Sequence, residues 1–365
     1  MNWKFWQKQK DRKKVKKSKS REWAEAIVFA VVAATLIRTF AIEAYTIPTP
    51  SMEKSLMVGD FLFVSKLSYG PRLPMTPLSF PFAHNTMPLL GTKSYLEWLQ
   101  WKYRRLPGFG KIKNNDVVVF NYPMEDYRPV DKQDNYIKRC VGIGGDTLQI
   151  INRVVHINGK PIEQPPRAQY KYHVKTDGSG FNPKTLLKMD ITEGGPISIE
   201  GDFLFNLTVE NADKMKQFAN VRGIEPYNAP EGYYTEDVFP YTEFYPWNLD
   251  NYGPVVLPKK GMEILLDLNN INIYRRAIEV YEGNVVQERD GKILINGTEA
   301  SSYTFNMDYY WMMGDNRHNS LDSRYWGFVP EDHIVGKAVF VWMSLDYNAT
   351  LLNKIRWSRV FRSIK

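Results

Sequence analysis

The chain has 365 residues, of which 43% are hydrophobic and 24% charged, so it can bury a substantial core and is not a disordered protein. Its net charge is +8, but residues 1–21 hold ten Lys or Arg against one acid, a local excess of +9. Subtracting this excess leaves −1 for the rest, which argues against a nucleic-acid-binding face and points to a membrane surface. The single cysteine, Cys140, excludes an internal disulfide and is expected in the core.

The segment after this basic tail predicts a membrane anchor. Its most apolar part, residues 26–37, has Thr35 as its one polar residue and is too short to cross a bilayer. A helix over residues 23–42 has 20 residues and would be about 30 Å long, which is sufficient. We therefore expect a transmembrane anchor within residues 22–44, with the tail 1–21 held in the cytoplasm by its positive charge. A cleaved signal peptide and a buried core helix are the alternatives.

A first part of a catalytic body is expected over residues 45–160, where strand patterns dominate. The segment 146–162 predicts a hairpin with its turn at Asn158-Gly159. Three further runs are typical of strands: DFLFVSKLSYG (60–70), NDVVVFNYP (115–123) and NYIKRCVGIGGD (135–146).

Residues 71–110 differ from their surroundings because they are rich in proline and aromatic side chains. The stretch SYLEWLQWKYRRLPGFG (94–110) predicts a short helix carrying Tyr95, Trp98 and Trp101. These aromatic residues suit either core packing or docking at a membrane interface.

The remaining chain divides into three parts. Residues 161–284 have short alternating runs, which predicts an inserted β-rich subdomain. Residues 285–345 form the second part of the catalytic body and include a late strand, IVGKAVFVWMS. The fold class expected from these patterns is therefore mainly β, a body of strands behind a transmembrane helix.

The C-terminal segment 346–365 is basic and predicts an amphipathic helix. Its apolar residues fall at helical spacing opposite a polar face of arginines: Trp357, Val360, Phe361 and Ile364 against Arg356, Arg359 and Arg362. Such a helix suits a membrane surface and packing on the β body equally well.

The sequence lacks the motifs of several hydrolase classes. Its five histidines form no HExxH metal motif, and no GxSxG elbow surrounds a serine. We expect no metal and no cofactor. A Ser-His-Asp triad remains open, but no local motif favours it.

The stretch IPTPSMEKSLMVGD (47–60) offers a nucleophile in Ser51, directly after the predicted anchor. Pro48 and Pro50 restrict the backbone to extended conformations, so Ser51 lies on a stiff segment. A lysine can activate a serine if burial lowers its pKa by about 3 units, to near 7 or 8. Lys138 suits this role because its strand face, shared with Tyr136 and Cys140, is mainly apolar, while Arg139 points away.

A third segment, GDNRHNSLDSR (314–324), holds two acids, two arginines and two serines within eleven residues. Asp-Arg pairs would hold it as a hydrogen-bonded turn. A hydroxyl from this turn could orient the lysine amine.

These segments, in this order and behind such an anchor, resemble the conserved motifs of bacterial type I signal peptidases. The resemblance rests on PTPSMEKSLMVGD, NDVVVFNYP, YIKRCVGIGGD and GDNRHNSLDSRYWGFVP. It covers roughly residues 22–69, 112–160 and 285–345. It implies a mostly antiparallel β fold with an inserted second β region.

The resemblance also implies roles for individual residues. Ser51 matches the nucleophile and Lys138 the general base, while the Thr49 hydroxyl and the Ser51 N–H match the oxyanion hole. Ser320 matches the residue that hydrogen-bonds the catalytic lysine. Further residues match positions that support the site: Gly314, Asp315, Asn316, Asp322 and Arg324.

Two positions depart from the family pattern. Lys54-Ser55 stands where the pattern S-M-x-P-T-L has Pro-Thr, which puts the local turn in question. Ile143-Gly144 replaces the usual Leu-Pro, a change that we expect to be conformational only.

The function implied is the removal of signal peptides with small residues before the cleavage site. The enzyme would lie in the bacterial inner (cytoplasmic) membrane with its catalytic body on the outer face, in contact with lipid and the export machinery, and it would bind no nucleic acid. A processing enzyme for one cargo, a self-cleaving regulator and an inactive membrane-tethered β-rich assembly protein are the alternatives.

Overall fold

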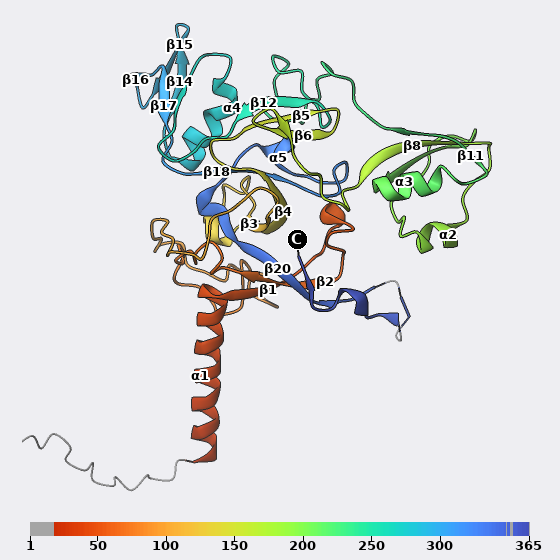
Figure 1. Cartoon of the computed structure of the whole chain (residues 1–365). Helices are drawn as coiled ribbons and strands as arrows, with labels where there is room; N and C mark the ends of the chain where they lie inside the picture. The colour runs from red at the N-terminus through yellow and green to blue at the C-terminus, as the bar shows by residue number, and fades with distance from the viewer. Residues whose placement is uncertain (1–17, 348, 351–352, 365) are drawn as a thin grey trace, which may run out of the picture.

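The computed structural model describes residues 18–347, 349–350 and 353–364. Most of the basic tail 1–21 lies outside these residues. Within them the fold is mainly β, as predicted: antiparallel sheets form a body from which one long helix projects (Figure 1).

That helix, α1 (Lys19–Phe40), begins after Ser18, whose side chain accepts a hydrogen bond from the Arg21 N–H. None of its residues is buried, and its most apolar 18-residue window has a mean hydropathy of 1.6. It is long and apolar enough to cross a membrane, and no other helix in the described residues is. Because no residue of α1 is buried against the rest of the described protein, the alternative of a buried core helix does not apply. The helix ends earlier than the predicted anchor because the chain from Ile42 pairs as a strand.

The central sheet has eight antiparallel strands in the order β1-β2-β20-β3-β4-β18-β19, with β21 paired to β20. The strands are β1 (Ile42–Thr46), β2 (Asp60–Ser65), β3 (Val117–Asn121), β4 (Asn135–Gly142), β18 (Tyr309–Met313), β19 (Val329–Pro330), β20 (Ile334–Ser344) and β21 (Arg362–Ser363). The three predicted strand runs and the late strand are β2, β3, β4 and β20.

Alternate residues of this sheet enter separate cores, as strand geometry requires. Val117 and Val119 of β3 pack with Met52 in one cluster. Val118 packs with Cys140 of β4 and Trp326 in another. Cys140 is buried and free, as predicted.

A second sheet, in the order β12-β5-β6-β7, packs on Trp311 of β18 through a large apolar cluster. Its strands are β5 (Thr147–Ile151), β6 (Val154–Ile157), β7 (Lys160–Pro161) and β12 (Tyr252–Val256). The predicted turn Asn158-Gly159 joins β6 to β7, with both residues at positive φ.

A two-stranded and a three-stranded sheet lie beyond this second sheet. Their strands are β13 (Glu263–Leu265), β14 (Val286–Arg289), β15 (Lys292–Ile295), β16 (Thr298–Glu299) and β17 (Ser302–Thr304).

The four-stranded sheet β11-β8-β10-β9 forms a separate lobe with its own core (Figure 1). Its elements are β8 (Tyr170–Thr176), α2 (Pro183–Lys188), β9 (Gly194–Pro196), β10 (Asp202–Leu207), α3 (Val209–Met215) and β11 (Val221–Pro226). Residues 161–284 therefore contribute to several sheets, since β12 and β13 lie outside this lobe. The other helical segments are short: η1 (Pro50–Met52), η2 (Val130–Lys132), α4 (Ile271–Arg276), η3 (Ala277–Tyr281), α5 (Ser323–Trp326), η4 (Glu331–His333) and η6 (Trp357–Arg359).

The helix predicted over residues 94–110 is wrong. This segment is extended and forms isolated bridges with residues 72–86, such as Ser79 to Tyr95. Tyr95 is buried, whereas Trp98 and Trp101 are exposed. Pairing with the preceding segment replaces the hydrogen bonds that a helix would have made within itself.

The C-terminal amphipathic helix is also wrong for the described residues. The chain there forms the turn η6 and the strand β21, and Phe361 between them has a φ of 57°. Arg359, assigned to the polar face, is buried and its Nε donates to both carboxylate oxygens of Asp60 at 3.0 and 3.2 Å. This buried ion pair holds the segment to the sheet in a form that a helix could not adopt.

Candidate active site

Ser51 lies in η1, a single 3-10 turn between β1 and β2. Thr49 is extended, and Pro50 opens the turn at a position where its missing N–H costs nothing. Met52 follows and is fully buried, which pins the turn to the core. Ser51 itself is 8% exposed.

Lys138 lies in β4 and directs its ammonium group at this serine. Its Nζ lies 2.7 Å from Ser51 Oγ and also donates to the Ile137 carbonyl at 3.1 Å. The side chain is 3% exposed, and Nζ lies 5.5 Å from the centre of the Tyr136 ring. Lys138 therefore occupies the apolar setting that its strand face predicts.

Burial lowers the pKa of Lys138 from 10.5 to about 8, because a charged ammonium loses hydration in this setting. The carboxylates of Asp322 and Asp315 act in the opposite direction. At a pH near neutrality a useful fraction of this amine is therefore neutral and able to accept a proton.

The loop after β18 brings Gly314 against η1, the turn that holds Ser51. A Cβ on Gly314 would lie 2.5 Å from the Ser51 carbonyl oxygen and 2.2 Å from Ser320 Oγ. Both distances are far below normal contact, so no side chain fits there. The Gly314 N–H donates to Asp322 at 3.0 Å, and the Asn316 N–H donates to the Ser51 carbonyl at 3.1 Å.

Asp322 is fully buried and holds this loop through Arg324. Arg324 donates from Nε and Nη2 to the two carboxylate oxygens at 2.9 and 2.8 Å. Burial would raise the pKa of Asp322, but the neighbouring guanidinium holds it below its ordinary value. The Asp-Arg pairing expected for this segment is thus present.

Asp315 pairs with the strand residue next to the lysine. Arg139 donates to its two oxygens at 2.8 and 2.6 Å, and both residues are buried. Consecutive strand residues point to opposite faces, so Lys138 can approach Ser51 while Arg139 anchors the loop. The sequence offered no local signal for this partner of Asp315.

One of two further predicted residues, Ser320, lacks the contact that the resemblance implies for it, while the other, Thr49, lies beside Ser51. Ser320 Oγ is buried and has no hydrogen-bond partner in the described part of the chain, so it is not bonded to Lys138. Thr49 Oγ1 lies 3.5 Å from Ser51 Oγ, which places a hydroxyl beside the nucleophile.

Sequence reasoning missed the contribution of the lobe β8–β11. Glu193, just before β9, accepts hydrogen bonds from the Asn316 side chain at 2.8 and 3.0 Å. The Gln169 N–H donates to the Asp315 carbonyl at 2.8 Å. No motif marks either residue, because their role depends only on where the lobe packs.

Lys54, one of the departures from the family pattern, also contacts the lobe. Its Nζ lies 3.1 Å from Asp190, and its backbone has a φ of 70°. Proline has its φ locked near −65° and cannot adopt this conformation. The lysine therefore belongs to a turn shape that the usual Pro would not permit.

Comparison with known proteins agrees with this architecture. The family model described as signal peptidase, peptidase S26, matches residues 20–234 and 286–343. The chain is 28% identical over 339 residues to signal peptidase I of Buchnera aphidicola subsp. Acyrthosiphon pisum (strain APS), covering 92% of this chain and 80% of that protein.

Two relatives from other bacteria extend the comparison. Signal peptidase I of Haemophilus influenzae (strain ATCC 51907 / DSM 11121 / KW20 / Rd) is 27% identical to this chain over 375 residues. The match covers 95% of this chain and 77% of that protein. Signal peptidase I of Helicobacter pylori (strain J99 / ATCC 700824) is 25% identical to this chain over 349 residues. The match covers 93% of this chain and 91% of that protein. The protein is therefore a hydrolase of the serine endopeptidase class. Within that class, the chain belongs to the peptidase S26 family of signal peptidases.

Proposed function

We propose that this protein cleaves signal peptides from exported preproteins, with Ser51 as nucleophile and Lys138 as general base. One observation carries the assignment of these roles: Lys138 Nζ is buried and lies 2.7 Å from Ser51 Oγ. This distance is within the reach that a general base needs to accept a proton from its nucleophile. Membership of the signal peptidase family supports the substrate class.

The reaction begins when neutral Lys138 accepts the Ser51 hydroxyl proton as Oγ attacks the scissile carbonyl carbon. The Lys138 ammonium then returns this proton to the leaving amine as the peptide C–N bond breaks. A water molecule gives a proton to Lys138 and attacks the resulting ester. This attack forms a second tetrahedral intermediate. As its bond to Ser51 Oγ breaks, Lys138 returns the proton to Oγ, which restores the Ser51 hydroxyl and releases the signal peptide.

The Thr49 hydroxyl and the Ser51 N–H stabilise the oxyanion in both steps. The extended backbone at Thr49 and the 3-10 turn at Ser51 support this role, because they bring the Thr49 hydroxyl to 3.5 Å from Ser51 Oγ. Substrates with small residues before the cleavage site follow from the family resemblance, as does contact with the export machinery.

We further propose that α1 anchors the enzyme in the bacterial inner membrane, with the tail 1–21 inside and the β body outside. The exposed apolar surface of α1 supports the anchor, and the ten positive charges in the tail support its orientation. Protease added outside spheroplasts should digest the body and spare the tail. Digestion of the tail from outside would reverse the orientation.

The dyad is tested by preprotein cleavage in non-ionic detergent. Ser51→Ala and Lys138→Ala should each lower the cleavage rate by at least 100-fold, since removing a general base alone costs about 10²–10⁴-fold. Ser179→Ala and Lys175→Ala, both at exposed positions of the lobe, are the matched controls and should cleave normally. Full activity in Lys138→Ala, with circular dichroism confirming the fold, would rule out the proposed base.

A further inference from the structure

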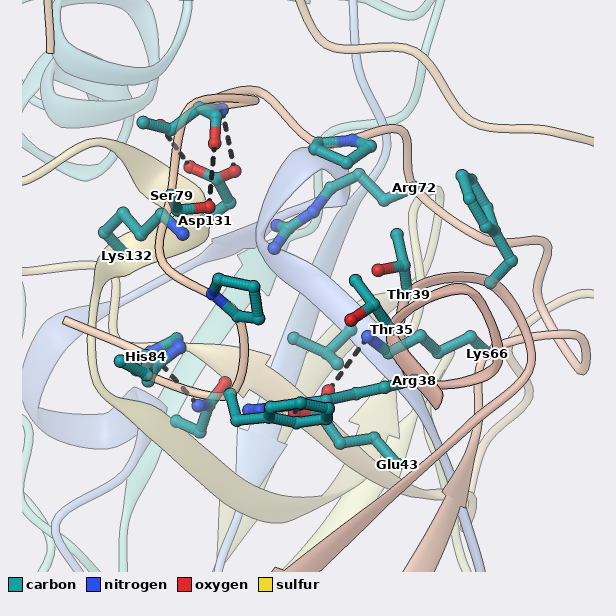
Figure 2. Close-up of a pocket in the computed structure, with 18 of the residues that line it drawn as sticks. Thr35, Arg38, Thr39, Glu43, Lys66, Arg72, Ser79, His84, Asp131 and Lys132 are labelled. Carbon is teal, nitrogen blue, oxygen red and sulfur yellow. Dashed lines mark hydrogen bonds and ion pairs between the residues drawn. The ribbon is translucent and has the colours of Figure 1, made fainter. Parts of the chain in front are cut away.

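A polar cavity lies away from Ser51, at the junction of α1 with the β body. It has a volume of about 340 Å³. Its walls come from the last two turns of α1, the segment 72–84 and the start of β4. Figure 2 shows Arg38 and Thr35 of α1 on one side, with Asp131 and Lys132 on the other.

Positive charge dominates this cavity. Arg38, Lys66, Arg72 and Lys132 line it together with two carboxylates, Glu43 and Asp131, which leaves a net charge of +2. Burial lowers the pKa of Lys66 and of Lys132, and nearby arginines act in the same direction, while Glu43 opposes the shift at Lys66 and Asp131 opposes it at Lys132. An anion in the cavity would relieve this repulsion.

The two carboxylates do not neutralise the four cations. Glu43 is shared, with Arg38 Nε at 2.6 Å and Lys66 Nζ at 2.8 Å. Asp131 instead accepts hydrogen bonds from the Thr76 N–H and hydroxyl at 2.8 and 2.7 Å. Its oxygens are therefore occupied by neutral donors.

Lys132 and Arg72 are the cations of this cavity whose side chains make no ion pair or hydrogen bond to a carboxylate among the described residues, although Asp131 lies near enough to act on both. Among the described residues the Lys132 side chain makes no ion pair or hydrogen bond, and its Nζ lies 5.6 Å from the centre of the Tyr95 ring. Arg72 donates to the Asn121 side chain at 2.8 Å and to the Asp332 carbonyl, both neutral acceptors. Figure 2 shows both side chains pointing into the pocket.

The position of the cavity identifies the source of an anion. Arg38 is the first charged residue after the apolar run 26–37, so the cavity lies where that run leaves a bilayer. Phe80 and Phe82 line it and are about half exposed. A lipid could therefore place its phosphate among the cations and its acyl chains beside these rings and α1.

We propose that this cavity binds the headgroup phosphate of an anionic phospholipid from the leaflet around the C-terminal end of α1. Lys132 and Arg72 bind the phosphate oxygens, since both ammonium and guanidinium groups form strong charge-assisted hydrogen bonds to phosphate. The net positive charge selects an anionic over a zwitterionic lipid. This inference rests on the proposed membrane anchoring by α1.

The test uses the full chain carrying Ser51→Ala, so that lipid binding is measured without catalysis. The protein in non-ionic detergent is titrated with phosphatidylglycerol, phosphatidylcholine or glycerol phosphate, and bound ligand is counted by native mass spectrometry. Lys132→Gln removes a cation whose side chain makes no ion pair or hydrogen bond among the described residues, so the fold should persist. Lys102→Gln, at an exposed position outside the cavity, removes the same charge as a control.

We expect one tightly bound phosphatidylglycerol per chain and about tenfold weaker binding in Lys132→Gln, with Lys102→Gln unchanged. Equal binding by the two variants would overturn the site. Equal binding of phosphatidylcholine would overturn the selectivity, and equal binding of glycerol phosphate would show a soluble anion site instead. Cleavage by the Ser51 protein in lipid-free detergent tests the proposed function separately.

Discussion

Lys138 Nζ lies 2.7 Å from Ser51 Oγ, although 87 residues separate the two in the sequence. The contact forms because η1 lies against β4 while the loop after β18 closes over both. Three segments distant in sequence thus meet around one hydroxyl. The predictions below test what this arrangement does.

Cleavage should depend on pH through Lys138. Only the neutral amine can accept the Ser51 proton, and burial brings the pKa of this lysine to about 8. We expect kcat/KM to rise about tenfold per pH unit below pH 8 and to level off above it. A pH-rate profile from 6 to 10 measures this dependence. A flat profile over this range would show that Lys138 is not the base.

The same burial should affect stability in a defined pH window. Below about pH 8 the lysine is charged in both the folded and the unfolded protein. The folded protein then bears the full free-energy cost of burying the charged ammonium, roughly 3 kcal/mol. Above its unfolded pKa both states are neutral and the cost vanishes. Lys138→Met should therefore raise Tm at pH 7 and much less at pH 10.5. A Tm gain that did not shrink with pH would contradict this account.

Thr49→Val should lower kcat and leave KM largely unchanged. The substitution keeps the shape of the side chain and removes a hydroxyl that would bind the oxyanion only during reaction. The loss of one such donor costs about 10²–10³-fold in kcat. Thr49→Ser retains the hydroxyl and should stay within a few-fold of the original enzyme. Steady-state kinetics on one preprotein would distinguish them, and equal activity of the two variants would exclude the donor role.

Gly314→Ala should damage both the fold and the activity. The new methyl group would overlap the Ser51 carbonyl and Ser320, so the loop must move away from the nucleophile. Overpacking of this kind costs about 1–3 kcal/mol. Gly223→Ala in β11 is a matched control, since a Cβ there meets nothing within 4 Å. Thermal unfolding and cleavage assays should show a loss only in the first variant.

Restoring the family's usual proline at Lys54 should destabilise this protein. Lys54 has a φ of 70°, which proline cannot reach, and its ammonium pairs with Asp190. We expect Lys54→Pro to lower Tm by several degrees. Lys54→Gly keeps the backbone conformation and should cost less, because it loses only the ion pairs. A more stable proline variant would mean that this turn adopts the usual family shape.

The apolar helix and the strands β2, β3, β4 and β20 could be predicted from the chain alone, and Ser51 and Lys138 could be named as candidates in the same way. These features follow from local periodicity, from prolines that stiffen the backbone, and from motif order, all of which are legible along the chain. The helices predicted over residues 94–110 and at the C-terminus were wrong because contacts distant in sequence decided the structure there. There, bridges to residues 72–86 and the buried pair of Arg359 with Asp60 outweighed a local helical pattern.

Only the tertiary structure decided how the site is assembled. The ion pair of Arg139 with Asp315 and the bonds of Glu193 to Asn316 join segments more than 100 residues apart. Such contacts depend on how whole sheets pack, and no local sequence pattern encodes them. The same holds for the pKa of Lys138, which follows from the burial that this packing imposes on one amine.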